Sequence, residues 1–206
     1  DSRIGSKYIK GGLGFGGACF PRDNVALSFM CKELNTNHAL LDTTDSYNNT
    51  LSQRFVDTIS PHVKKGQTAA VLGLAYKPLS HIVEESQGIL LAKALSDIGL
   101  RVIGYDPLAA DEARPVLQYH TLVEDNLANA LKEATIVLVA NNDDVFKNLT
   151  PDQVLLNKEK VTVVDFWRCL NSEFCDHPRI EYIPIGKCLS PNLNIEKFRT
   201  LWGNPL

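Results

Sequence analysis

The sequence predicts an α/β protein in which a helical segment precedes a doubly wound parallel sheet. From residue 64 onward, short apolar runs alternate with helical patterns, as parallel strands alternate with their crossover helices. Before residue 64, apolar residues recur mainly at helical spacing. We therefore place a domain boundary between residues 63 and 64, which gives domains over 1–63 and 64–206.

The first domain is expected to hold a glycine loop and two helices. The stretch GGLGFGGACFPRDN (11–24) has five glycines in its first seven residues. A helix is predicted over 21–34, because Pro21 suits a first helical position and Asp23 falls in the first turn. A second helix is predicted from residue 40, with one apolar stripe formed by Leu40, Tyr47, Leu51, Phe55, Ile59 and Val63. Such a long helix can join domains or form a dimer seam, and packing within its own chain is the alternative.

The second domain is expected to alternate strands with helices. A buried strand lies within VKKGQTAAVLGLAYKP (63–78) and stops before Pro78. The elements predicted after it are a helix over 86–99, a strand over 100–107, a helix over 124–134, strands over 135–141 and 161–167, and a candidate strand over 180–186. Because helices separate the strands, right-handed crossovers and a parallel sheet are expected.

Composition excludes several classes of function. The formal net charge of -3 gives no electrostatic footprint for nucleic acid. No apolar run of about 18 residues indicates a membrane span, and no leader pattern is found. The odd, scattered cysteine set without a CxxC pair indicates reduced thiols in a cytoplasmic protein and no zinc site. We interpret four of the cysteines as small buried hydrophobes: Cys31, Cys169, Cys175 and Cys188.

The glycine loop admits several readings. Gly12, Gly14 and Gly17 satisfy GxGxxG, but a dinucleotide fingerprint sits in a strand-helix-strand unit, and here no second strand follows. A Walker A loop would need Lys-Ser/Thr where Ala18-Cys19 stands. A flexible linker remains an alternative. The reading that we favour is chemical, because the unpaired N–H groups and the dipole of the following helix favour a thiolate at Cys19, and glycines allow close approach to a ligand.

The stretch GFGGACFPRD (14–23) resembles the catalytic-cysteine motif of the UDP-glucose/GDP-mannose dehydrogenase family. Three further segments agree with that family in order and spacing: RIGSKYIK (3–10), VLGLAYKP (71–78) and VVDFWR (163–168). The resemblance covers essentially the whole chain and is strongest to the UDP-glucose 6-dehydrogenase branch. It implies a central helical domain, a Rossmann-like C-terminal domain that binds a UDP-sugar, and a homodimer formed through the helix over 38–63.

The resemblance also implies a reaction, the NAD-dependent oxidation of UDP-glucose to UDP-glucuronate. The C6 alcohol gives up a hydride, and Cys19 captures the aldehyde as a thiohemiacetal. A second hydride transfer leaves a thioester, which water cleaves to the acid. Asp23 would order or deprotonate that water. Stabilisation of the first helical turn is the alternative role for Asp23.

Further residues are assigned by the resemblance. A cradle for the nucleotide sugar would comprise Lys10, Gly11, Gly12, Leu13, Gly14, Phe15 and Gly16. Tyr8 would stack nearby, and Arg3 would reach into the partner subunit. The sheet domain would add Tyr76, Lys77 and Arg168, and Lys77 ends a buried strand where ligands of open α/β sheets bind. Ordinary exposed cations are the alternative for Lys10 and Arg3. NAD would be held mainly by a domain expected before residue 1, with Arg22 contributing.

Two departures from the family pattern restrict the expected activity. Ile82 and Glu84 stand where the family usually has an aspartate and an arginine, and a carboxylate there would repel a pyrophosphate. The chain carries only the part with the nucleophile, so we expect weak UDP-sugar binding without turnover. The alternatives are a catalytically silent nucleotide-sugar binding or dimerisation module, and a family member that acts on UDP-N-acetylmannosamine or GDP-mannose.

Overall fold

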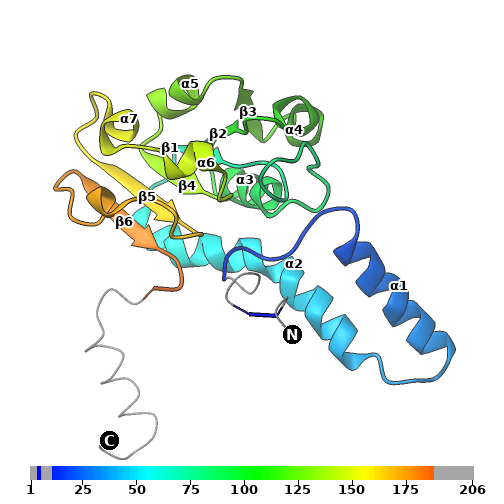
Figure 1. Cartoon of the computed structure of the whole chain (residues 1–206). Coiled ribbons are helices and arrows are strands. Elements are labelled where there is room, and N and C mark those ends of the chain that lie inside the picture. The colour runs from blue at the N-terminus through cyan, green and yellow to red at the C-terminus, as the bar shows by residue number, and fades with distance from the viewer. Residues whose placement is uncertain (1–3, 6–10, 188–206) are drawn as a thin grey trace, which may run out of the picture.

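A computed structural model describes residues 4–5 and 11–187 of the 206-residue chain. Its first two helices form a hairpin that projects from an α/β unit (Figure 1). Helix α1 spans Phe20–Glu33, and helix α2 spans Ala39–Ile59. The hairpin is joined where the Asn24 side-chain amide donates to the Leu41 carbonyl at 2.9 Å.

Helix α2 ends earlier than the sequence predicts. Its last turn tightens into a 3-10 helix over Ser60–His62. Pro61 has no N–H to donate to the carbonyl of Asp57, and the Ser60 hydroxyl donates to that carbonyl at 2.9 Å instead. The expected stripe therefore stops being α-helical one turn before Val63.

The α/β unit is a six-stranded parallel sheet with the order β3-β2-β1-β4-β5-β6. The strands are β1 (Thr68–Leu72), β2 (Arg101–Tyr105), β3 (Thr121–Glu124), β4 (Ile136–Val139), β5 (Val161–Asp165) and β6 (Ile180–Pro184). The crossover segments contain α3 (Gln87–Asp97), α4 (Ala110–Leu117), α5 (Leu127–Lys132), α6 (Asp144–Lys147), α7 (Pro151–Leu155) and a 3-10 helix (Ser172–Phe174). The predicted doubly wound parallel fold is confirmed, and the strand order reverses between β1 and β4.

Several elements differ from the prediction. Strand β3 and helices α4, α6 and α7 were not anticipated, and the helix expected over 124–134 is shorter. Glu124 belongs to β3. The chain then turns, and the Asn126 side chain caps α5 by accepting from the N–H of Ala128 at 2.8 Å. The helix therefore begins three residues later than predicted.

Apolar side chains pack on both faces of the sheet. One cluster joins the sheet to α3 and to the end of α2, through Leu91, Leu95, Val56 and Ile59. The other joins it to the helices on the opposite face, through residues such as Leu131, Phe146 and Leu155. Because the end of α2 shares the core of the sheet unit, the domain boundary at residue 64 stays a prediction. Within the described ranges, no helix combines the length and apolarity needed to cross a membrane.

Candidate functional site

The glycine loop is held between α2 and α3 by the backbone of Phe15. The Phe15 N–H donates to Asn48 Oδ1 on α2, and the Phe15 carbonyl accepts from Asn48 Nδ2, both at 3.0 Å. Gln87 Nε2, at the start of α3, donates to the same carbonyl at 3.0 Å. Both amide side chains are buried. A loop that resembles a linker in sequence is therefore fixed from two sides.

Two glycines of this loop are required by close approach to the chain itself. A Cβ on Gly14 would lie 2.2 Å from Asn48 Oδ1, and a Cβ on Gly16 would lie 2.2 Å from the Glu85 carbonyl oxygen. The Gly17 N–H donates to the Glu84 carbonyl at 2.9 Å. At these positions the missing side chains make room for α2 and for the loop before α3. Approach of the loop to a ligand stays a prediction.

Cys19 stands at the N-terminal end of α1, as the sequence predicts, and its side chain is exposed. The carbonyl of Cys19 accepts from the N–H of Asp23 at 2.8 Å, which closes the first turn. The Asp23 carboxylate is exposed, with Arg22 Nε 3.4 Å from its Oδ1. The thiol and the carboxylate thus lie about one helical turn apart at an accessible helix end.

A groove of about 650 Å³ lies beside this helix end. Its lining includes Gly17, Ala18, Arg22 and, from neighbouring segments, the acidic residues Asp45, Glu84 and Glu85. Among the described residues that line the groove, three carboxylates and one guanidinium are a poor match for the pyrophosphate of a dinucleotide. The described residues of this groove therefore do not by themselves fit the phosphates of NAD.

A buried carboxylate also accepts the backbone N–H groups that bind the pyrophosphate in a dinucleotide-binding sheet. Asp106 follows β2, and its Oδ2 accepts from the N–H groups of Leu74 and Ala75 at 2.8 and 2.9 Å. Its Oδ1 accepts from two more N–H groups, those of Leu108 and Ala109. In a dinucleotide-binding unit, the turn after the first strand offers such N–H groups to the pyrophosphate. Here Asp106 uses them, so the sheet resembles a Rossmann unit without offering that cradle.

The segments that follow β1 and β5 contact the two ends of the glycine loop. Lys77 does not end the buried strand as the sequence predicts, because β1 stops at Leu72. After β1, the ring of Tyr76 packs against Gly17, where a Cβ would lie 2.6 Å from the ring. Lys77 is exposed, with its ammonium 5.3 Å from the centre of the Tyr76 ring. After β5, the guanidinium of Arg168 donates to the carbonyl of Gly11, and to that of Ile185 at 2.6 Å. The structure thus brings Tyr76 and Arg168 to the loop that leads to Cys19, with Lys77 beside the ring of Tyr76.

Other predicted residues are less informative. Leu13 packs against the core. Arg3, Tyr8, Lys10 and Cys188 lie outside the described residues. Cys31 and Cys169 are partly buried, but Cys175 is exposed, so its assignment as a buried hydrophobe was wrong. Cys175 comes directly after the 3-10 helix over Ser172–Phe174. Phe174 is the buried residue of that helix, whereas Cys175 faces solvent.

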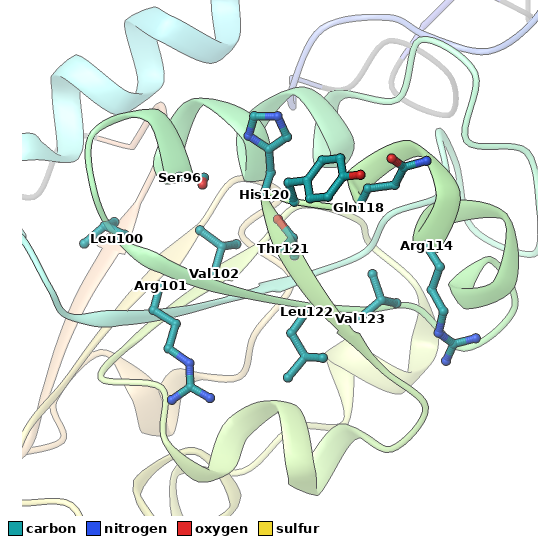
Figure 2. Close-up of a pocket in the computed structure, with 11 residues that line it drawn as sticks. Ser96, Leu100, Arg101, Val102, Arg114, Gln118, His120, Thr121, Leu122 and Val123 are labelled. Carbon is teal, nitrogen blue, oxygen red and sulfur yellow. The ribbon is translucent and has the colours of Figure 1, made fainter.

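A second concavity, of about 610 Å³, lies at the free edge of the sheet beside β3 (Figure 2). Its two arginines are already paired, Arg101 with Glu133 and Arg114 with Asp111 and Asp125. In residues 4–5 and 11–187, no group of three or more His, Cys, Asp or Glu side chains could hold a metal ion. Because its arginines are already paired, this concavity does not compete with the glycine loop as a candidate site.

Comparison with known protein families gives a match for each of two regions of the chain. The model for the UDP-binding domain of the UDP-glucose/GDP-mannose dehydrogenase family matches residues 70–172, and the model for the central domain of the same family matches residues 1–50. The chain belongs to this family. The first matched region covers most of the sheet unit, up to the segment before β6. The second covers the glycine loop, α1 and the first half of α2.

Relatives within the family are UDP-glucose 6-dehydrogenases. That of Haloferax volcanii is 36% identical over 79% of this chain and 38% of its own length. That of Rhizobium meliloti is 28% identical over 91% of this chain and 43% of its own length. A solved UDP-glucose dehydrogenase from Pyrobaculum islandicum, 27% identical, superposes with a TM-score of 0.76 over 91% of this chain and 41% of that chain. The chain thus spans about two fifths of the length of these family members.

Several residues of the site were missed by sequence reasoning. Asp106 and Asp165, whose carboxylates accept from backbone N–H groups after β2 and β5, could have been noticed, because each is an acidic residue at the end of an apolar run. Trp167 stands next to the predicted Arg168. Asn48 and Gln87 gave no signal, because their contacts with Phe15 cross 33 and 72 residues of sequence.

Proposed function

We propose that this chain is the nucleophile-bearing and UDP-sugar-binding part of an NAD-dependent dehydrogenase that oxidises UDP-glucose to UDP-glucuronate. The observation that carries this proposal is the course of the glycine loop. One end of the loop leads to the exposed Cys19, and the other end is contacted by Arg168 at the carboxyl end of β5. Ligands of open α/β sheets bind at the carboxyl ends of strands.

Binding of the nucleotide sugar would use the cations at this edge. The guanidinium of Arg168 contacts only carbonyls among the described residues, and Lys77 is exposed. Both are available to the diphosphate, since a guanidinium can bind phosphate oxygens in a bidentate manner. With the diphosphate there, the sugar extends along the loop towards Cys19.

The chemistry of the chain's own residues follows from this orientation. The Cys19 thiolate adds to the C6 aldehyde, and a thioester at this sulfur is later hydrolysed. Asp23 holds the attacking water, because its carboxylate is exposed on the same helical turn. NAD would accept the hydrides and would be held mainly by residues outside this chain, with Arg22 contributing from the lining of the acidic groove.

Two further properties belong to the proposal. The natural protein is a homodimer formed through α2, whose first half exposes apolar side chains such as Leu40 and Tyr47. It works in the cytoplasm, in keeping with the free thiols of Cys19, Cys31, Cys169 and Cys175.

The nucleophile assignment is tested by Cys19→Ser in the longest natural protein that contains this chain. We expect that UDP-glucose is no longer converted to UDP-glucuronate, as followed by chromatography of the products. Cys31→Ser is the matched control and should retain conversion. Complete oxidation to the acid by Cys19→Ser would contradict the assignment.

A second candidate is a silent UDP-sugar binding or dimerisation module. The acidic lining at Glu84 and Glu85 favours it, because it disfavours a bound pyrophosphate. It predicts UDP binding in a calorimeter together with no NADH production by the longest natural protein. NADH production would exclude it, and a panel containing UDP-N-acetylmannosamine and GDP-mannose would then identify the sugar.

A further inference from the structure

Asp165, the last residue of β5, is a fully buried carboxylate that organises the turn after the strand. Its Oδ1 accepts from the Trp167 N–H at 3.0 Å and lies 3.9 Å from the Cys169 thiol. Its Oδ2 accepts from the Leu170 N–H at 3.0 Å and from the Tyr182 hydroxyl at 2.9 Å. Four donors thus converge on two oxygens, and together they fix the chain from Trp167 to Leu170.

The turn contains a backbone conformation that is unfavourable for a residue other than glycine. Arg168 lies in the left-handed region, at φ 53°, which is uncommon for a residue other than glycine. With this conformation, the guanidinium bonds to the carbonyls of Gly11, Phe166 and Ile185. The Asp165 backbone takes part as well, because its carbonyl accepts from the Ile185 N–H at 3.0 Å.

The neighbouring Trp167 fixes the glycine loop from the same turn. Its indole N–H donates to the Ala140 carbonyl at 2.9 Å, which orients the ring. The ring lies where a side chain of Gly12 would be, with a Cβ there only 2.7 Å from the ring. The bonds of one carboxylate therefore place a ring against Gly12 and a cation beside Gly11.

We propose that Asp165 is a positioning residue, which holds Arg168 at the place where the diphosphate of the UDP-sugar binds. The inference rests on the proposed function, since it assigns the diphosphate to Arg168. Asp165 acts through the turn and does not touch the ligand. Its carboxylate is suited to this role because both of its oxygens accept, whereas an amide would turn an NH₂ group towards one pair of donors.

The test compares the affinities of the 206-residue chain for UDP and for uridine, by calorimetry and by ligand-observed NMR. We expect Asp165→Asn and Arg168→Ala each to weaken UDP binding by roughly tenfold, the size expected for a charge-assisted contact with phosphate. Uridine binding should change little. The double variant should lose no more than either single variant, because both changes remove the same contact. Asp143→Asn, at another buried carboxylate, is the matched control and should retain UDP affinity.

Tyr182→Phe keeps the test decisive if Asp165→Asn does not fold, because it removes one donor and leaves the carboxylate. It should weaken UDP binding more than uridine binding and shift the Trp167 emission in a Trp202→Phe background. Equal losses for UDP and uridine, full UDP affinity in Asp165→Asn, or additive losses in the double variant would overturn the positioning role. Failure of the unaltered chain to bind UDP would instead contradict the proposed function.

Discussion

Gly16 lies so near the backbone before α3 that one added carbon would have to displace it. A Cβ there meets the Glu85 carbonyl at 2.2 Å, whereas a Cβ on Gly11 meets its nearest atom, Arg168 Nη2, at an ordinary 3.6 Å. We expect Gly16→Ala to lower the free energy of unfolding by about 1–3 kcal/mol, as overpacking does. Gly11→Ala is the matched control and should change it by less. Urea unfolding followed by circular dichroism measures both, and equal stability of the two variants would contradict the packing described.

The thiols of Cys19 and Cys169 should differ sharply in reactivity. The pKa of the Cys169 thiol is raised to about 12, mainly by burial and secondly by the negative charge of Asp165. Because the thiolate is the reactive form, Cys169 should resist alkylation at pH 8, while the exposed Cys19 and Cys175 are modified. Iodoacetamide labelling with peptide mass spectrometry gives the order of modification. Labelling of Cys169 before Cys19 would be inconsistent with the burial of its thiol.

The pairing of α1 with α2 depends on the ionised side chain of Asp42. Its carboxylate accepts from the Ser28 hydroxyl, from the ammonium of Lys32 at 3.1 Å, and lies 2.9 Å from His38 Nδ1. Hydrogen bonds lower the pKa of Asp42 from 3.8 to about 2; the bond from Ser28 is the largest cause and the bond from Lys32 is the next. These contacts therefore favour the ionised carboxylate and tie the two helices together.

This lowered pKa fixes the pH dependence of the hairpin. A carboxyl group whose pKa is lower in the folded than in the unfolded chain stabilises the fold above its unfolded pKa. That stability is lost as the pH falls from about 4 to about 2. We expect the ¹³C shift of the Asp42 carboxyl to titrate with a midpoint near the lower value, and Asp42→Asn to destabilise the hairpin at pH 6. Asp57→Asn, on the same helix, is the control. A midpoint at or above 3.8 would refute the assigned contacts.

Local signals predicted most helices and strands of this chain. Pro21 and Asp23 placed the start of α1 within one residue, and short apolar runs located β1, β2, β4, β5 and β6. Helix α4 was missed because Pro115 interrupts it, and β3 because four residues are too few to show a period. Local patterns therefore serve well for long, regular elements and poorly for short or interrupted ones.

The candidate site was predicted less completely than the fold, because its contacts are distant in sequence. The motif around Cys19 indicated that this cysteine stands at the start of a helix, and the structure places it there, with its side chain exposed. The bond from Arg168 to Gly11 crosses 157 residues, and no local pattern could predict it. Asp106 and Asp165 accept hydrogen bonds from backbone N–H groups, and these bonds form only in the folded sheet. The sequence therefore did not reveal this role.

The molecule as a whole is asymmetric in where it exposes apolar side chains. The second half of α2 is part of the core, through Val56 and Ile59. The projecting hairpin (Figure 1) instead carries exposed apolar side chains. Leu40 is 78% and Tyr47 53% exposed, and on α1 Phe29 is exposed as well. Apolar side chains gathered on a projecting element mark an interaction surface more often than a free one. A second copy of the chain is the occupant that the proposed homodimer requires.

Sedimentation equilibrium tests this surface. We expect the chain to dimerise at micromolar concentration and Leu40→Glu to weaken the dimer by about tenfold or more, because the change buries an unpaired charge in an apolar seam. Leu122→Glu is the matched control, since Leu122 is also half-exposed but lies on β3 at the far edge of the sheet. The control should dimerise like the unaltered chain. A monomer at high micromolar concentration would contradict dimerisation through α2, and an unchanged dimer of Leu40→Glu would place the seam away from the start of this helix.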